Sequence, residues 1–450
     1  MSHLSVAKFG GTSVANYPAM QSCANIVIAD PNTRVVVLSA SAGVTNLLVA
    51  LANGCEEPER NKLLNEVRQI QENILTELKD DSRVRPKIEA LLANITSLAE
   101  AANLATSLAL TDELISHGEM MSSLIFVEVL RELQIEATWL DVRTIVATNS
   151  HFGKAAPNDE QTRQNCESVL KPLIERGELV ITQGFIGRDE QGKTTTLGRG
   201  GSDYSAALLA EVLNAQDVLI WTDVAGIYTT DPRIVSNAQR IDTMSFSEAA
   251  EMATFGAKVL HPATLLPAVR SNIPVYVSSS KVPQDGGTWV TRNPQPRPTF
   301  RAIALRRDQT LLTLSSLNML YAQGFLANIF TILAKHKISV DTITTSEVSV
   351  ALTLDKTGSA SSGKSLLSQE LIEELSQFCT VKVDTGLSLV ALIGNELHTA
   401  SGVAKRIFET LDAYNIRMIS YGASTNNICL LADSDKADDI VRSLHRSLFE

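Results

Sequence analysis

The sequence is poor in the features that mark several large classes of protein. Its 450 residues include five cysteines, none of them in a Cys-x-x-Cys pair, which argues against a disulfide framework and a zinc site. No apolar run reaches the roughly 18 residues of a membrane-spanning helix. The N-terminus lacks the basic stretch and apolar core of a secretory signal. The predicted location is therefore the cytoplasm.

Positive charge is also scarce. The chain has 39 Lys and Arg residues against 50 Asp and Glu residues, for a formal net charge of −11, so no basic patch for nucleic acid is expected. No Gly-x-Gly-x-x-Gly follows a predicted strand, which argues against a dinucleotide fold. The histidines are scattered and form no His-Glu-x-x-His pair. What remains is an enzyme or a sensor of two or three domains.

The stretch TTTLGRGGSDYSAALLA, residues 194–210, has the composition of an anion site. Its glycines let a ligand approach the backbone, and the alanine-rich run predicts a helix whose first N–H groups attract negative charge. Ser202 and Asp203 are expected to cap this helix. Arg199 adds a guanidinium that suits a carboxylate or a phosphate. An ordinary glycine-rich turn with a helix cap is the alternative.

A second glycine pair follows the first predicted strand, Leu4–Phe9. Lys8 lies at the end of this strand, and Gly10 and Gly11 come next. Their backbone N–H groups and the ammonium group together suit a phosphate. In a Walker P-loop the lysine follows the glycines, so this is a different motif. A lysine that precedes a Gly-Gly turn by chance is the alternative.

Two further predicted strands, Arg34–Ser39 and Asp217–Trp221, end in small polar residues. Open α/β sheets bind ligands at the carboxyl ends of their strands. The residues at or just beyond these ends are therefore candidate ligand contacts: Ser39, Thr45, Thr222 and Asp223.

Three other positions are candidates of different kinds. Glu119 shares a face of a long predicted helix with small and apolar residues, where a carboxylate needs a partner; a salt-bridged structural glutamate is the alternative. Tyr228 could stack on a base and Arg233 could meet a phosphate, with a plain turn as the alternative. Lys258, near the end of a helix, is a second possible phosphate ligand.

The order of the predicted elements indicates the architecture. Strands alternate with helices up to about residue 290, which predicts an α/β fold with a parallel-rich central sheet between helices. A stretch rich in Pro follows, and then a βαββα pattern occurs twice. We expect a catalytic domain at 1–290, a linker at 291–299, and small α+β domains at 300–386 and 387–450. The second of these lacks a strand, which residues 300–306 are expected to supply.

Four motifs together resemble one family. KFGGTS, TTTLGRGGSD, WTDVAGIYTTDPR and MATFGAKVLHP, in this order, are similar to the motifs of the amino-acid kinase family and of its aspartate kinase branch, in the monofunctional, lysine-sensitive bacterial form. The duplicated pattern resembles tandem ferredoxin-like ACT domains, which sense amino acids. The resemblance implies ATP-dependent phosphorylation of the β-carboxylate of L-aspartate to 4-phospho-L-aspartate. That reaction is the first step toward lysine, threonine and methionine.

The resemblance also implies roles for individual residues. The implied catalytic residues for phosphoryl transfer are Lys8, Asp203 and Lys258. The implied aspartate-binding residues are Ser39, Thr45, Glu119, Phe185, Arg199, Gly200, Gly201 and Ser202. The implied nucleotide-binding residues are Lys8, Gly10, Gly11, Thr222, Asp223, Tyr228, Arg233, Lys258 and Val259. The implied lysine-binding residues are Met319, Phe325, Leu326, Ser339, Val340, Asp341, Thr345, Ser346 and Glu347.

The implied ligands are ATP, Mg²⁺, L-aspartate and, as inhibitor, L-lysine. Mg²⁺ is expected to bridge the phosphates, and no protein ligands for a metal are predicted. Asp203 is expected to position Lys8 or Arg199 and not to act as a base. The expected assembly is a homodimer or a dimer of dimers through the ACT domains. Two other functions stay open: a non-catalytic amino-acid sensor with a relic nucleotide-binding domain, and a kinase for glutamate, carbamate or UMP.

Overall fold

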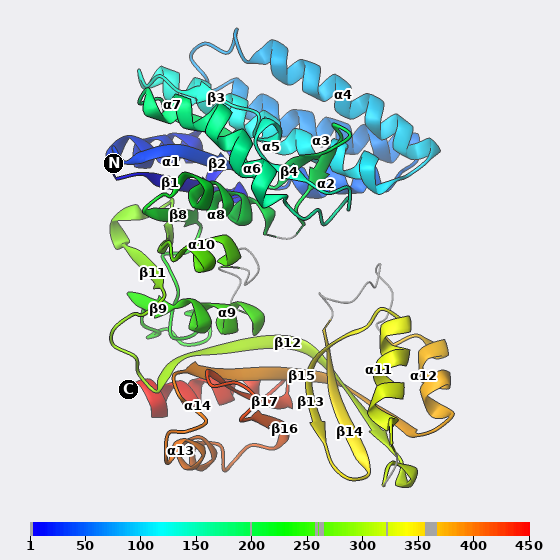
Figure 1. The fold of residues 1–450 in the computed structure, drawn as a ribbon. Coiled ribbons are helices and arrows are strands. Elements are labelled where there is room, and N and C mark those ends of the chain that lie inside the picture. The colour runs from blue at the N-terminus through cyan, green and yellow to red at the C-terminus, as the bar shows by residue number, and fades with distance from the viewer. Residues whose placement is uncertain (1–2, 199, 257–259, 261–264, 321–322, 356–366) are drawn as a thin grey trace. The chain divides into compact units, whose positions relative to one another are not determined.

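The computed structural model describes residues 3–198, 200–256, 260, 265–320, 323–355 and 367–450 (Figure 1). The chain divides into two compact units. The first comprises Met1–Ile227, Arg240–Ala250 and Lys258–Gln295. The second comprises Tyr228–Gln239, Glu251–Ala257 and Pro296–Glu450.

The first unit is built on an eight-stranded sheet in the order β3-β5-β2-β1-β8-β10-β11-β9. Neighbouring strands in the described residues are parallel, except for the antiparallel pair β10 and β11. The strands are β1 (Ser5–Phe9), β2 (Thr33–Leu38), β3 (Thr138–Trp139), β5 (Val180–Gln183), β8 (Asp217–Thr222), β9 (Thr243–Ser245), β10 (Val275–Ser279) and β11 (Gly287–Thr291). The parallel-rich sheet that the sequence predicts is confirmed.

Helices cover both faces of this sheet. Ala7 and Phe9 of β1 belong to the apolar core beneath α1–α5. Because side chains alternate along a strand, Lys8 points to the opposite face, where α8 packs on β1 and β8. The helices that begin in this unit are α1 (Tyr17–Ala29), α2 (Val44–Ala52), α3 (Glu57–Leu75), α4 (Arg85–Leu104), α5 (Leu108–Glu132), α6 (Asp159–Asn165), α7 (Lys171–Glu175), α8 (Gly201–Leu213), α9 (Phe246–Thr254) and α10 (Leu266–Ser271).

The first unit also contains a separate sheet of three strands. It contains β4 (Ala147–Thr148), β6 (Ile186–Asp189) and β7 (Thr194–Thr196). The antiparallel pair β6 and β7 forms a hairpin. This hairpin delivers the chain to the glycine-rich stretch at the start of α8.

The second unit contains a six-stranded antiparallel sheet in the order β13-β14-β12-β15-β17-β16. Two apolar clusters, one in each half, hold the helices on the sheet. The elements are β12 (Phe300–Ser315), α11 (Phe325–Lys335), β13 (Ser339–Thr345), β14 (Ser349–Asp355), α12 (Gln369–Ser376), β15 (Thr380–Gly394), α13 (Val403–Thr410), β16 (Ile416–Tyr421), β17 (Asn427–Asp433) and α14 (Ala437–Phe449).

The two halves of this sheet share their long central strands, β12 and β15. The first part of β12 pairs with the last part of β15, from Phe300 opposite Gly394 to Arg306 opposite Leu389. Leu387–Ile393 of β15 in turn pair with β17. Residues 300–306 thus lie in the half of the sheet that carries α13 and α14, while the rest of β12 pairs with β14.

Two segments from the middle of the chain, residues 228–239 and 251–257, belong to the second unit. Residues 228–239 lie within the range expected for the catalytic domain, yet they pack with the C-terminal part of the chain. Thr229 is buried and its hydroxyl is 2.9 Å from Nε2 of His445 on α14. The backbone N–H of Ile303 donates to the Thr229 carbonyl. A single domain boundary at residue 290 therefore does not account for residues 228–239. These residues are held in the second unit by contacts with residues that are distant in sequence.

Candidate active site

A buried ion pair lies at the carboxyl end of the central strand. Nζ of Lys8 is 2.6 Å from Oδ1 of Asp203, and the two side chains are 11% and 14% exposed. The sequence predicts that Asp203 positions Lys8 or Arg199, and the first of these contacts is present. The expected helix cap is wrong: α8 begins at Gly201, and its N-cap is Gly200, which makes no side-chain cap hydrogen bond.

The conformation of Gly200 explains why the Asp203 side chain can pair with Lys8 and is not needed as a helix cap. This residue has φ +74°, which glycine adopts without strain. The helix therefore starts before Ser202 and Asp203, and Asp203 lies in its first turn. A carboxylate there is favoured by the positive end of the helix dipole. The aspartate side chain is thus free to meet Lys8 on the neighbouring strand.

The Gly10–Gly11 turn is fixed to β8 and to the loop that follows β2. The N–H of Gly10 donates to the carbonyl of Trp221 at 3.0 Å, and the N–H of Ala42 donates to the carbonyl of Gly11 at 3.1 Å. A Cβ added to Gly11 would lie 2.8 Å from the carbonyl oxygen of Ala40. Only glycine fits there, so the close approach of the two loops depends on this residue.

Glu119 is buried beside these loops. It lies on α5, which contacts the Ala40 loop so closely that a Cβ on Gly118 would be 2.8 Å from the Ala40 Cβ. Burial raises the pKa of the Glu119 carboxyl to about 8, although the Ala40 backbone and the charge of Lys8 act in the opposite direction. Within the described residues its Oε2 has no hydrogen-bond partner. The salt-bridged structural glutamate that the sequence left open is not found in that part of the chain.

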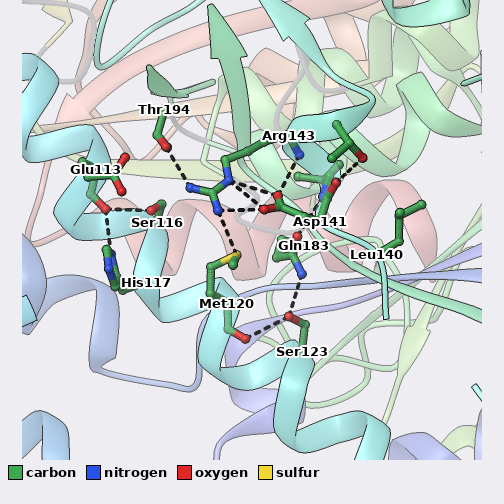
Figure 2. Close-up of polar contacts among 12 residues, drawn as sticks. Glu113, Ser116, His117, Met120, Ser123, Leu140, Asp141, Arg143, Gln183 and Thr194 are labelled. Atoms are coloured by element: carbon green, nitrogen blue, oxygen red, sulfur yellow. Dashed lines mark hydrogen bonds and ion pairs between the residues drawn. The ribbon is translucent and has the colours of Figure 1, made fainter. Parts of the chain in front are cut away.

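Side chains around α5 fix its orientation (Figure 2). Nη1 of Arg143 donates to the hydroxyl of Thr194 at 2.9 Å, and Nη2 lies 3.9 Å from the sulfur of Met120. The Ser123 hydroxyl donates to the Met120 carbonyl and accepts from the Gln183 amide. These contacts connect the helix that carries Glu119 to β5 and β7.

Asp112, on the first part of the same helix, holds the start of the glycine-rich stretch. Its carboxylate accepts from the N–H and hydroxyl of Thr196 and from the N–H of Gly153, each at 2.8 Å. Burial raises its pKa. Sequence reasoning missed Asp112 and Arg143, because Thr196 lies 84 residues from Asp112 and Thr194 lies 51 residues from Arg143, and no local pattern marks these two contacts.

Phe185 and Gly201 meet where β5 ends. A Cβ on Gly201 would lie 2.7 Å from Cδ2 of Phe185, and one on Gly184 would lie 2.6 Å from the Cβ of Ser202. Phe185 has φ +72°, which is uncommon for a residue other than glycine. The structure therefore brings together three of the predicted aspartate-binding residues, Phe185, Gly201 and Ser202. Ser39 and Thr45 are at the end of β2 and the start of α2, beside β1.

The predicted nucleotide residues fall into two groups. Thr222 is the last residue of β8, the strand next to β1, and Asp223 follows it, so both lie at the same sheet edge as Gly10. Tyr228 and Arg233 belong to the second unit. Arg233 is exposed and its guanidinium is 2.6 Å from the Asp231 carboxylate. Arg199, Lys258 and Val259 lie outside the described residues.

The predicted lysine-binding residues all belong to the half of the second unit that carries α11 and α12. Met319 precedes α11, which begins at Phe325 and Leu326 after Gly324. Ser339, Val340, Asp341 and Thr345 are on β13, and Ser346 and Glu347 form the turn to β14. Asp341 is largely buried and 2.9 Å from Arg306, whereas Glu347 is exposed. The solvated-turn alternative therefore does not describe Asp341.

Comparison with known proteins places this arrangement in a family. Residues 3–279 match the amino acid kinase family and residues 390–448 match an ACT domain. The fold and the site thus define an amino acid kinase with an ACT-type module. The chain belongs to the aspartokinases of this family. It is 62% identical over 450 residues to the lysine-sensitive aspartokinase 3 of Escherichia coli K12, with both chains fully covered. It is 34% identical over 463 residues to the chloroplastic aspartokinase 3 of Arabidopsis thaliana, covering 99% of this chain and 81% of that one.

Solved structures agree with the fold. The structure of E. coli aspartokinase III with aspartate and ADP, called the R-state, matches with a TM-score of 0.89 at 61% identity. The complex of the same enzyme with lysine and aspartate, called the T-state, matches with a TM-score of 0.88. Both cover all of this chain and all of the matched chain. The predicted amino-acid kinase fold with ACT domains is confirmed. In the described residues no helix is long and apolar enough to cross a membrane.

Proposed function

We propose that this chain transfers the γ-phosphoryl group of ATP to the β-carboxylate of L-aspartate, giving 4-phospho-L-aspartate and ADP, and that L-lysine inhibits it. The observation that carries the proposal is the Lys8–Asp203 ion pair beside a buried Glu119 carboxylate, one oxygen of which has no partner in the described part of the chain. Support comes from a relative at 62% identity over the full chain.

The reaction brings two anions together, so its main requirement is neutralisation of charge. Lys8, with Gly10 and Gly11 beside it, would stabilise the phosphoryl group as charge develops on its oxygens. Asp203 keeps the ammonium group in place on the buried face of β1. A carboxylate nucleophile carries no proton at neutral pH, so Asp203 is a positioning residue and not a base.

Glu119 is the proposed partner of the ammonium group of aspartate. Its buried carboxylate has a desolvation cost that the cationic substrate would offset, and Arg199 would meet the α-carboxylate. Ser39, Thr45, Phe185, Gly200, Gly201 and Ser202 would complete the pocket. Gly201 packs closely against Phe185, where a Cβ would lie 2.7 Å from Cδ2, and this contact holds the start of α8 against the end of β5.

The nucleotide would lie along the edge formed by the ends of β1 and β8. Thr222 and Asp223 would contact it there, and Tyr228, Arg233, Lys258 and Val259 are further proposed contacts. Mg²⁺, when bound, would neutralise and bridge the phosphate oxygens. Asp203, at this edge, is already engaged by Lys8, so the ion fits as one carried by the phosphates.

Lysine would bind at the half of the six-stranded sheet that carries α11 and α12. The start of α11 after Gly324 offers backbone N–H groups to an α-carboxylate. Asp341 and Glu347 offer two anions for two ammonium groups, and a ligand with one amine would leave one of them unmatched. Exposed apolar side chains near this site, among them Leu317, Leu326, Phe330 and Ile343, favour the predicted homodimer through this module.

One assay separates the candidate functions. ADP release is followed with aspartate, glutamate, carbamate or UMP as acceptor, and hydroxylamine traps any acyl phosphate. We expect turnover and hydroxamate with aspartate alone, and a lower rate with added lysine. A chain that binds lysine without turnover would be the non-catalytic sensor, and turnover with another acceptor would identify a different kinase of the superfamily.

The lysine site has its own test. Asp341→Ala and Glu347→Ala each remove one anionic partner of the effector, so we expect the lysine concentration for half inhibition to rise at least tenfold, about 1.4 kcal/mol. Each variant is compared with its own rate without lysine. Calorimetric titration with lysine is the direct check. Unchanged affinity in both variants would place the effector site elsewhere.

A further inference from the structure

A pair of buried serines connects the glycine turn after β1 to the end of β8. The Ser13 and Ser280 hydroxyl oxygens are 2.7 Å apart, and both residues are almost fully buried. The Ser280 hydroxyl is also 3.1 Å from the carbonyl oxygen of Thr222. The two serines are 267 residues apart in the chain, and neither is among the residues for which the sequence predicts a role.

The shorter distances favour one direction for these hydrogen bonds. A carbonyl oxygen can only accept, so in this arrangement Ser280 donates to Thr222 at 3.1 Å and its oxygen accepts from the Ser13 hydroxyl. The opposite arrangement would leave Ser13 to donate to the Trp221 carbonyl at 3.5 Å, the limit of a hydrogen bond. The relay therefore runs from Ser13 through Ser280 to the Thr222 carbonyl.

Each end of the relay belongs to a different part of the nucleotide edge. Ser13 lies in the helical turn Gly11–Val14, and its N–H donates to the Gly10 carbonyl at 2.9 Å. Thr222 is the last residue of β8 and precedes Asp223. The relay thus joins the proposed phosphate turn to the proposed nucleotide contacts Thr222 and Asp223. The Gly10 N–H bond to Trp221 is a second connection one residue away.

We propose that Ser13 and Ser280 are positioning residues for the nucleotide: their relay holds the phosphate turn in register with the end of β8. This inference rests on the proposed function for its choice of ligand, a nucleoside diphosphate or triphosphate. The proposed aspartate contacts Glu119 and Thr45 are held by α5 and α2 instead. Loss of the relay therefore weakens nucleotide binding and leaves aspartate binding unchanged.

The test is calorimetric titration of the full chain with ADP. In Ser13→Ala and in Ser280→Ala we expect the Kd for ADP to rise about tenfold, the effect of one lost buried hydrogen bond. Because both residues serve one relay, the double variant should be little weaker than either single variant. The KM for aspartate should stay within about twofold of the wild-type value.

Ser278→Ala is the matched control. Ser278 is on β10, close to Ser280 in sequence, is fully buried, and donates to the Gly286 carbonyl at 2.6 Å. Its loss should lower the Tm as much as the relay variants do and leave the Kd for ADP unchanged. If a relay variant fails to fold, the corresponding Ser→Cys variant, with its weaker donor, takes its place with a smaller increase expected.

Three results would overturn the proposal: an ADP Kd within twofold of wild type in both single variants, fully additive effects in the double variant, or an equal loss of aspartate affinity. Failure of the proposed function looks different. A wild-type chain that binds ADP and does not phosphorylate aspartate would refute the kinase activity, while the ADP titration would still decide the relay.

Discussion

Lys8 and Asp203 are more strongly coupled than surface ion pairs. Both side chains are nearly buried, so each has lost hydration, and removal of one leaves the other charge without compensation. Substitution of either residue should therefore change both the catalytic rate and the free energy of unfolding.

We predict that Lys8→Ala and Asp203→Ala lower kcat by at least about 10²-fold, because an electrostatic contact to the transferring group is lost or misplaced. Each single variant should also be destabilised, by about 3 kcal/mol or more, since one buried charge stays unpaired. The double variant should unfold at a higher temperature than either single variant. Thermal unfolding and single-turnover rates check this; a double variant less stable than both would show that the pair does not carry the effect.

Glu119 predicts a pH dependence of stability. Its pKa is about 8 in the folded chain, against an ordinary value of 4.5, so between these values the folded state keeps a proton that the unfolded state releases. Stability from this group is therefore lost as pH rises from 4.5 to 8, by about 5 kcal/mol in total. We predict that Glu119→Gln raises the Tm at pH 8 relative to wild type and changes it little at pH 4.5.

The same group makes aspartate binding depend on pH. The substrate ammonium favours the ionised carboxylate, so binding should release a proton below pH 8, measurable as a buffer-dependent enthalpy. In Glu119→Gln that proton release should vanish together with tight aspartate binding. An equal pH dependence of Tm in wild type and Glu119→Gln would contradict the assignment.

Among the helices and loops, the contact between α5 and the Ala40 loop determines where Glu119 lies. Gly118→Ala would place a Cβ 2.8 Å from the Ala40 Cβ, and neither atom can rotate away. Overpacking of this kind costs about 1–3 kcal/mol, against about 1 kcal/mol gained from helix propensity. We predict a small change in Tm and a severalfold rise in the KM for aspartate.

Ser116→Ala is the control for this variant. Ser116 is buried on the same helix, and within the described residues its hydroxyl bonds only inside the helix, to the Glu113 carbonyl. It should leave the aspartate KM unchanged. A normal KM in Gly118→Ala would mean that the loop accommodates the methyl group without moving the site.

Across the whole chain, the proposed aspartate and lysine sites belong to different compact units. Inhibition requires lysine to favour a state with lower affinity for substrates, with a coupling of about 1–3 kcal/mol. Coupling is reciprocal, so aspartate with ADP should weaken lysine binding by the factor by which lysine weakens theirs, roughly 5–150-fold. Calorimetric titrations in both orders test this, and unequal factors would rule out a single coupled equilibrium.

Local patterns in the amino-acid sequence were enough to predict the class of fold, the repeated C-terminal pattern, the family and the position of Lys8 before its glycines. The buried residues of α3 and α4 recur at helical spacing, among them Leu63, Val67 and Ile74 on α3, because apolar spacing fixes which face a helix buries. Ser245 and Glu248, three residues apart, form the reciprocal hydrogen bonds of a capping box, which is another local pattern.

Which distant groups meet is evident only in the folded chain. In the folded chain Asp203 pairs with Lys8 and does not cap α8, and the Asp112 carboxylate accepts a hydrogen bond from Thr196. Residues 228–239 pack with the second unit. Ser13 also pairs with Ser280 across 267 residues. A sequence pattern reports how a segment repeats, whereas a buried polar contact depends on the register of strands that are far apart along the chain. The burial that raises the Glu119 pKa arises in the same way, from elements that converge only in the folded molecule.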